Sequence, residues 1–134
     1  MINTKILFEN CQKARQFSRS PYSHFAVGAV VVLKSGELIN GCNIENAAYG
    51  LCMCAERTAL FNAYSKGIKK DDIEAIGIIG DTELPISPCG SCRQVMVELL
   101  NKETPVYMFN LKGDLKIMTV EELMPFSFSE GDLS

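Results

Sequence analysis

The sequence has no excess of positive charge, no long hydrophobic run and only one histidine. Its 134 residues carry 13 Lys and Arg against 16 Asp and Glu, a net charge of −3. Because holding nucleic acid by its phosphates needs a basic face, this balance argues against a nucleic-acid-binding protein. It argues equally against attachment to an anionic membrane surface. The longest apolar run, 26–33, contains a glycine and is too short to span a bilayer.

The chain also lacks internal repeats, low-complexity segments and Gly/Ser-rich linkers. A content of 47% hydrophobic and 22% charged residues is typical of globular proteins, and this length suits one domain. We therefore expect residues 1–134 to form a single domain. The first residues show no apolar stretch ending in a small-residue cleavage site, so we expect no secretory signal and a cytoplasmic location.

Hydrophobic periodicity predicts helices and strands in alternation after an opening hairpin. Residues 3–17 have the spacing of an amphipathic helix capped by Asn3 or Thr4. Its predicted apolar side consists of Ile6, Leu7, Cys11, Ala14 and Phe17. The other expected elements are a hairpin (25–33 and 37–43), strands (73–79, 105–110 and 115–118), a helix (54–66), a helix from Ser87 and Pro88 to about 100, and a capping-box start at 119–122. This order predicts an α/β sandwich with a mixed sheet.

Six cysteines are the unusual feature of the composition. In the absence of a secretory signal, we interpret them as reduced thiols, some of which bind metal. Cys89 and Cys92 form a Cys-x-x-Cys motif at a predicted helix start, where one turn brings both sulfurs to one side. The same spacing also suits a thiol redox pair or two buried small hydrophobic residues.

A second motif, Cys54-Ala55-Glu56, also lies at a predicted helix start. With Cys89 and Cys92, Cys54 would give zinc three thiolates and leave a fourth position for water, which is the catalytic arrangement. Glu56 could face that position without binding the metal, and could carry a proton from water to a substrate nitrogen.

Zinc with three thiolates carries a net charge of −1, so activation of water needs compensating positive charge. Both helix dipoles would supply part of it and would favour thiolates. Arg57 and Arg93, each next to a cysteine motif, could supply the rest by hydrogen bonding to the sulfurs.

The remaining cysteines leave one alternative for the metal site. Cys52 could join the three other thiolates in a closed structural zinc site. We disfavour this arrangement because a structural site has no use for the nearby Glu56. Cys11 and Cys42 are interpreted as packing residues, and His24 as an exposed or capping residue.

These motifs resemble those of the zinc-dependent nucleoside and nucleobase deaminases. The resemblance is closest to the small homotetrameric cytidine deaminases and covers nearly the whole chain. It is carried by the segments 41–47, 54–60, 87–94 and 119–122.

The resemblance implies a three-layer α/β/α sandwich with a mixed central sheet, an opening helix and a β-hairpin. It implies one zinc ion per subunit, held by Cys54, Cys89 and Cys92. The implied reaction is hydrolytic deamination of cytidine and deoxycytidine to uridine and deoxyuridine plus ammonia, in pyrimidine salvage. Activated water would attack C4 of the base while Glu56 protonates N3, and the backbone N–H of Ala55 would hold O2.

For the substrate, Asn43 and Glu45 resemble the family's ribose-binding pair. Two residues apart at a strand end, their side chains should emerge on one face, and the carboxylate would repel a phosphate. This favours a nucleoside over a nucleotide. Phe25 resembles the aromatic residue that packs by the pyrimidine. Tyr49 and Phe126 resemble residues that reach a neighbouring subunit's site in the homotetramer.

Two other hypotheses stay open at this point. One keeps the chemistry but changes the substrate to a cytosine-containing nucleoside antibiotic or a nucleotide; deamination of bases within DNA or RNA is disfavoured because no basic groove is apparent. The other is a non-catalytic binding module held together by structural zinc. It predicts a closed metal site and no loss of function when Glu56 is changed.

Overall fold

The computed structural model describes residues 2–133. Within them, five strands form one sheet in the order β2-β1-β3-β4-β5. β1 pairs antiparallel with both β2 and β3, β3 runs parallel to β4, and β4 is antiparallel to β5. The predicted mixed sheet and opening hairpin are therefore confirmed. The strands are β1 (Val27–Leu33), β2 (Leu38–Cys42), β3 (Ile73–Gly80), β4 (Pro105–Asn110) and β5 (Leu115–Thr119).

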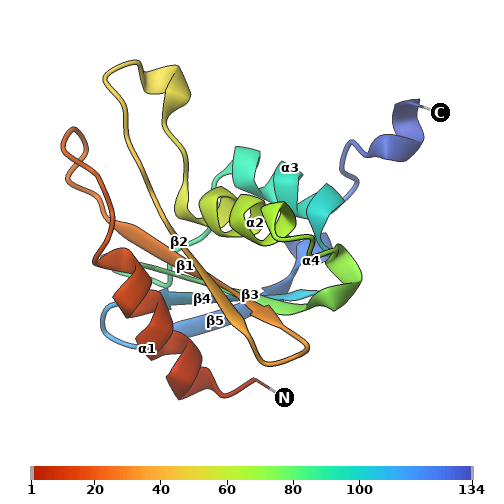
Figure 1. The fold of residues 1–134 in the computed structure, drawn as a ribbon, viewed down its shortest axis with the longest axis horizontal. Helices are drawn as coiled ribbons and strands as arrows, with labels where there is room; N and C mark the ends of the chain where they lie inside the picture. Colours follow the sequence, from red (N-terminus) through yellow and green to blue (C-terminus); the bar gives the residue numbers. More distant parts are fainter. Residues whose placement is uncertain (1, 134) are drawn as a thin grey trace.

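Helices cover both faces of this sheet, as Figure 1 shows: α1 (Thr4–Arg15) packs on one face, and α2 (Ala55–Ser65) and α3 (Gly90–Leu99) pack on the other. Two hydrophobic cores result, one on each face. β1 is buried along its whole length because its alternate residues enter different cores, Ala29 and Val31 on the α2 side and Val30 and Val32 on the α1 side. The three-layer α/β/α prediction is thus confirmed.

Glycines let helices approach the sheet closely at two points. A Cβ atom on Gly41 of β2 would lie 2.4 Å from the backbone nitrogen of Ala59, and one on Gly28 of β1 would lie 2.4 Å from the carbonyl oxygen of Cys11. Only glycine leaves room for backbone this near. The close approach at Gly41 sets the distance between α2 and the sheet.

The first helix begins as predicted but faces the sheet with fewer residues. Its N-cap is Asn3, whose side chain accepts a hydrogen bond from the Ile6 N–H at 3.1 Å. Leu7, Cys11 and Ala14 are buried, whereas Ile6 and Phe17 are exposed, so their assignment to the apolar side is wrong. Ile6 lies on the flank of the helix, and Phe17 lies beyond the helix end.

The helix expected from Ser87 and Pro88 begins two residues later than predicted. Cys89 is the N-cap of α3, with extended backbone angles, and its carbonyl accepts the first helical bond, from the Arg93 N–H at 3.0 Å. Pro88 therefore stands outside the helix, and its carbonyl accepts a hydrogen bond from the Arg93 side chain. This shift places a cysteine at the cap.

The last predicted element is present as α4 (Val120–Leu123), with a capping box between Thr119 and Glu122. Short 3-10 turns complete the secondary structure at Tyr49–Leu51, Lys70–Asp72 and Glu130–Leu133. In the part of the chain that the structure describes, no helix combines the length and apolar character that a membrane crossing requires.

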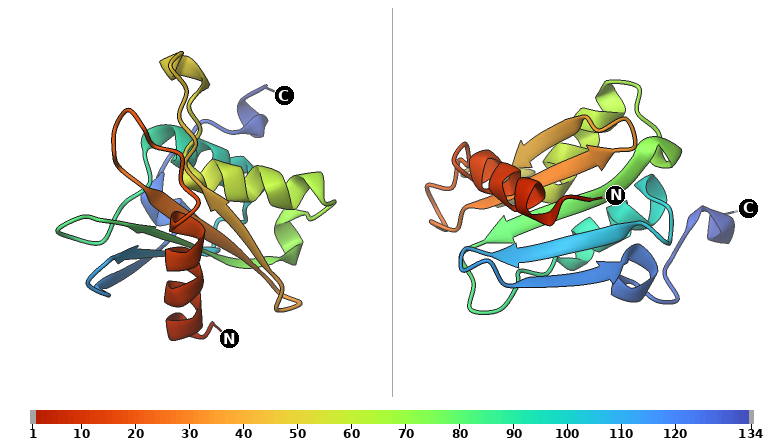
Figure 2. Two further views of the ribbon diagram at one scale, coloured as in Figure 1. Left: turned by 60° about the vertical axis from the view of Figure 1, so that its left-hand side comes forward. Right: turned by 90° about the horizontal axis from the view of Figure 1, so that it is seen from below.

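Two connecting segments, 16–26 and 43–54, project from the same end of the sheet (Figure 1). Backbone hydrogen bonds join them: the Arg19 N–H donates to the Asn43 carbonyl at 3.0 Å, and the Glu45 N–H donates to the Arg19 carbonyl at 2.8 Å. Figure 2 shows the C-terminal segment leading away from the body of the molecule after α4. The projecting segments carry Phe25, Tyr49 and the predicted sugar-binding pair.

Candidate active site

Three cysteine sulfurs lie together where α2 and α3 begin. Cys54 is the N-cap of α2, Cys89 is the N-cap of α3, and Cys92 lies in the first turn of α3. All three sulfurs lie within 4.8 Å of one another. The Cys54 and Cys89 sulfurs are 3.8 Å apart, and those of Cys89 and Cys92 are 3.5 Å apart. Neither N-cap cysteine caps its helix with a side-chain hydrogen bond.

This spacing fits a tetrahedral zinc ion. With Zn–S bonds of about 2.3 Å, tetrahedral geometry places two sulfurs about 3.8 Å apart. Cys92 is buried, Cys54 is half-buried and Cys89 is exposed, so the cluster reaches the surface on one side. The cluster therefore suits a metal that keeps one position accessible.

The three sulfurs do not share negative charge equally. Hydrogen bonding to the Cys92 side chain and then to Arg57 lowers the pKa of Cys54 to about 5. The pKa of Cys92 is raised, chiefly by its hydrogen bond to Cys54 and then by burial. Without a metal, negative charge thus concentrates on Cys54, because neighbouring thiolates repel each other. A divalent cation would remove that repulsion and allow all three sulfurs to ionise.

The two predicted charge-balancing arginines have different positions. Arg57 Nη2 donates to the Cys54 sulfur at 3.4 Å, and among residues 2–133 its buried Nε has no hydrogen-bond partner. Arg93 does not contact a sulfur through a hydrogen bond, contrary to the expectation: its Nε donates to the Pro88 carbonyl at 2.7 Å and its Nη1 to the Leu123 carbonyl at 2.8 Å. Arg93 directly follows Cys92 on the helix, and its side chain is turned toward α4 instead.

Glu56 lies in the first turn of α2, directly after Ala55. Its side chain is buried, with 5% exposed, and burial raises the pKa of its carboxyl. A buried carboxyl group beside the cysteine cluster, with a raised pKa, is suited to accept and return a proton. Ala55 is fully buried and is the first residue of α2, so its backbone N–H has no partner within the helix.

Cys52 does not belong to the cluster in the described residues. The Asn46 N–H donates to its sulfur at 3.3 Å, and that sulfur lies 3.5 Å from the Asn46 carbonyl oxygen. Cys11 is buried against the sheet, Cys42 is partly buried, and His24 is exposed. The structure therefore brings together the three expected sulfurs without a fourth.

The predicted sugar-binding pair lies on the projecting segments. The Asn43 side-chain amide donates to the Phe25 carbonyl at 2.7 Å and accepts from the Val27 N–H at 2.9 Å. The Glu45 carboxylate accepts from the backbone N–H groups of Tyr22 and Ser23 at 3.0 and 3.1 Å. Both side chains thus turn toward the same segment.

The three predicted aromatic residues differ in exposure and in their surroundings. Phe25 is partly exposed, and its ring tip would lie 3.4 Å from a Cβ atom on Gly80. Tyr49 is 74% exposed, and its ring packs edge-on against Tyr22 at 6.1 Å. Phe126 is fully exposed and has a positive φ of 50°.

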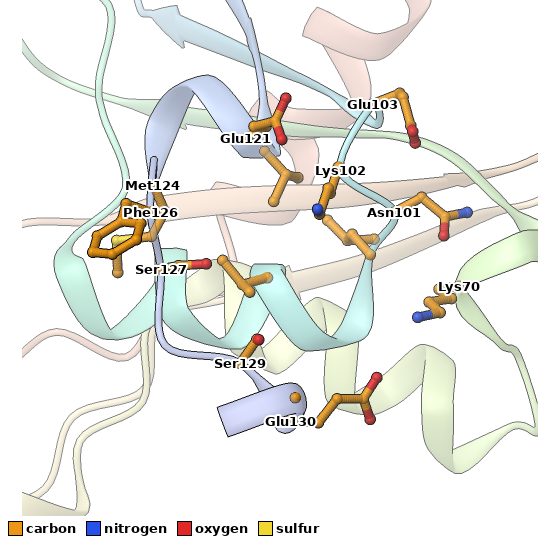
Figure 3. Close-up of a pocket in the computed structure, with 14 residues that line it drawn as sticks. Lys70, Asn101, Lys102, Glu103, Glu121, Met124, Phe126, Ser127, Ser129 and Glu130 are labelled. Atoms are coloured by element: carbon orange, nitrogen blue, oxygen red, sulfur yellow. The ribbon is translucent and has the colours of Figure 1, made fainter. Parts of the chain in front are cut away.

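Phe126 lies beside a cavity of about 740 Å³ that sequence analysis did not single out. The cavity lies between α3, α4 and the C-terminal segment, and Figure 3 shows Met124 and Phe126 close together on one side of it. Lys70 and Glu130 line its other end. None of the three cysteines lines it, so it is separate from the candidate metal site.

Comparison with known proteins agrees with the cluster and the fold. The family model for the cytidine and deoxycytidylate deaminase zinc-binding region matches residues 1–108. A cytidine deaminase of Halalkalibacterium halodurans is 48% identical over 133 residues, covering 99% of each chain. A cytidine deaminase of Sporosarcina psychrophila is 48% identical over 128 residues, covering 96% of this chain and 93% of the relative.

Among solved structures, the crystal structure of cytidine deaminase from Burkholderia pseudomallei superposes with a TM-score of 0.92 at 44% identity. The match covers 95% of this chain and 100% of that one. On sequence and on structure alike, this chain belongs to the cytidine and deoxycytidylate deaminase family.

Proposed function

We propose that this protein is a zinc-dependent enzyme that hydrolytically deaminates cytidine and deoxycytidine to uridine and deoxyuridine, with release of ammonia, in pyrimidine salvage. The observation that carries the proposal is the cluster of three cysteine sulfurs beside the buried Glu56. Cytidine deaminases that match over nearly the full chain at 48% identity support the same activity.

We expect Cys54, Cys89 and Cys92 to hold one zinc ion per subunit, as the spacing of their sulfurs supports. When bound, zinc supplies a Lewis acid that lowers the pKa of a water molecule. Arg57 would moderate the negative charge of the thiolates through its bond to Cys54. The positive ends of two helix dipoles act in the same direction.

Glu56 is the residue we expect to carry the proton. It would accept a proton from the attacking water and deliver it to N3 of the cytosine ring. As the new C4–O bond becomes a carbonyl, the second proton of that water would pass through Glu56 to the C4 amino group, and the C4–N bond breaks with release of ammonia. The burial of Glu56 keeps bulk water from taking over these transfers. The backbone N–H of Ala55, which has no partner within α2, would hold O2 of the base and so orient the ring.

The projecting segments would supply recognition of the sugar and base. Asn43 and Glu45 would bind sugar hydroxyls, and Phe25 would pack beside the pyrimidine. A carboxylate at the sugar position opposes a phosphate, which favours a nucleoside over a nucleotide.

We further propose that the enzyme is a homotetramer of single-domain subunits in the cytoplasm, where reducing conditions keep the three zinc-binding thiols available. The exposure of large apolar side chains supports assembly. Tyr49 is 74% exposed and Phe126 is fully exposed, and each could enter a neighbouring subunit's site. Light scattering would give the mass of the assembly.

The decisive experiment mixes purified, zinc-loaded protein with cytidine and follows the ultraviolet change to uridine, with Glu56→Ala as control. Turnover by the parent and not by the variant would support the reaction and the role of Glu56 together. No turnover by folded, zinc-loaded protein would refute the proposal for cytidine. Cytosine nucleoside antibiotics and cytosine nucleotides would be assayed next. Failure on all of them would favour the binding module held together by structural zinc.

A further inference from the structure

A chain of hydrogen bonds in the segment 18–25 holds both members of the sugar-recognising pair. Beyond its two backbone bonds, the Glu45 carboxylate accepts a third hydrogen bond, from the Ser23 hydroxyl. The Arg19 guanidinium donates to the Glu45 carbonyl at 2.8 Å and so ties down the backbone of the same residue. Glu45 is therefore held at both its main chain and its side chain.

The Ser23 hydroxyl also connects Glu45 to the rest of the recognition group. Its oxygen accepts a hydrogen bond from the Phe25 N–H at 3.0 Å. The Phe25 carbonyl in turn accepts from the Asn43 side chain, whose oxygen accepts from the Ser18 hydroxyl. The Ser23 hydroxyl thus bonds the carboxylate and the Phe25 backbone directly, and Phe25 connects them to the Asn43 amide.

This arrangement leaves a limited set of free hydrogen-bonding positions. A carboxylate offers about four lone-pair directions, and the segment 18–25 uses three at Glu45. At Asn43, the side-chain oxygen accepts two bonds, while one of the two amide hydrogens remains for another acceptor. One acceptor direction and one donor remain, which suits the hydroxyl groups of a sugar ring.

We propose that Ser23 is a positioning residue for sugar recognition, whose hydroxyl fixes the Glu45 carboxylate where it meets the ring hydroxyls of the nucleoside. The inference rests on the proposed function of Asn43 and Glu45. Without the hydroxyl, Oε2 of the carboxylate loses its partner and only the two backbone bonds to Oε1 remain, so the carboxylate is less firmly oriented and binding must order it at an entropic cost. Ser23 acts through Glu45 and does not touch the reacting atoms.

The charge state of Glu45 agrees with this role. The hydrogen bond from the Ser23 hydroxyl is the largest cause that holds the pKa of the Glu45 carboxyl below its ordinary value, followed by the Ser23 backbone N–H. The carboxylate therefore stays ionised and acts only as an acceptor. A sugar hydroxyl can donate to it.

The test compares Ser23→Ala with the parent on cytidine and on 2′,3′-dideoxycytidine, which lacks both ring hydroxyls. On cytidine, we expect KM to rise roughly three- to tenfold, the effect of one lost hydrogen bond, while kcat stays within about twofold. On dideoxycytidine, KM should be unchanged by the substitution, because no ring hydroxyl meets Glu45. Ser23→Thr keeps the hydroxyl and should restore the parent KM for cytidine.

A matched serine is available as a control. Ser35 accepts a hydrogen bond from the backbone N–H two residues later, as Ser23 does, but lies in the hairpin turn between β1 and β2. Ser35→Ala should leave both substrates unaffected. If Ser23→Ala fails to fold, Ser23→Cys, which matches the size with a weak donor, replaces it in the same comparison.

An equal rise in KM for both substrates would overturn the proposal, because a general disturbance of the segment does not distinguish the sugars. No rise in KM for either substrate would overturn it too. A large fall in kcat at unchanged KM would overturn it as well. If the parent enzyme does not deaminate cytidine at all, the proposed function fails first, and that result is visible before any variant is made.

Discussion

Replacement of Glu56 by glutamine changes one buried group and little else. The amide has nearly the same shape as the carboxyl, so packing under the cysteine cluster should survive. It cannot accept a proton from water or return one to the base. We expect Glu56→Gln to bind zinc with the stoichiometry of the parent, because the three sulfurs are untouched, and to lose nearly all turnover.

The structure sets the expected size of this loss. Positioned proton transfer contributes typically about 10²–10⁴ in rate. Because Glu56 is only 5% exposed, bulk water cannot easily replace it, which favours the upper end. We expect kcat to fall by about 10³–10⁴, equivalent to about 4–5.5 kcal/mol of activation free energy.

The same substitution has a pH-dependent effect on the stability of the metal-free protein. Burial raises the pKa of Glu56, so the folded state holds this proton more tightly than the unfolded chain. The associated stability is complete below the ordinary carboxyl pKa and is lost as pH rises through the raised value. Glutamine has no charge to bury. Relative to the parent, Glu56→Gln should therefore gain free energy of unfolding between acid and neutral pH.

Three measurements check these expectations: metal content by mass spectrometry, deamination by ultraviolet absorbance, and urea unfolding at acid and neutral pH. The control is Glu9→Gln, an exposed glutamate on α1 on the opposite face of the sheet, which should behave as the parent. Zinc-loaded Glu56→Gln with a kcat within about tenfold of the parent would refute the assignment of the proton carrier.

Three further substitutions test the surroundings of the site. Arg57→Gln removes the donor to the Cys54 sulfur, so the pKa of Cys54 should rise from about 5. Protons then compete with the metal at a higher pH, and zinc should be released at a higher pH than in the parent. An acid titration followed with a zinc-sensitive dye measures this release. Gly41→Ala should lower the free energy of unfolding, measured in urea, by about 1–3 kcal/mol, because the added Cβ would lie 2.4 Å from the Ala59 nitrogen. An unchanged urea midpoint would contradict the close approach of α2 to β2. Cys52→Ser should leave the zinc content unchanged, and loss of the metal would revive the four-thiolate alternative.

The sequence predicts the layers of this fold well because its apolar segments are long and clearly periodic. The run through β1 is buried on both faces, and the capping box at Thr119 and Glu122 lies where its spacing placed it. Local signals are weaker at α3, where Ser87 and Pro88 have the form of a helix start but Cys89 takes the cap. At this helix start, the residue at the N-cap is the cysteine of the cluster and not the serine that cap preferences favour.

Side-chain partners across the fold are harder to predict from the sequence. Arg57 and Arg93 look equivalent beside their motifs, yet only Arg57 donates to a sulfur, because α4 offers the Leu123 carbonyl to Arg93. The contact between Ser23 and Glu45 joins residues 22 positions apart, and neither residue type signals the other. Such contacts depend on how the segments 16–26 and 43–54 lie against each other, and hydrophobic periodicity does not predict this.

The cysteines at the two N-caps affect the local stability and the lifetime of the metal-free protein. Serine or aspartate at an N-cap typically stabilises a helix by about 1 kcal/mol, and neither Cys54 nor Cys89 makes the side-chain bond that provides it. Metal binding would tie down both helix starts, so subunits that never acquire zinc should fray there first. Amide hydrogen exchange in residues 55–58 and 90–93, with and without a chelator, would register the difference. Proteases act on frayed backbone, so unloaded chains would be cleared faster than loaded ones.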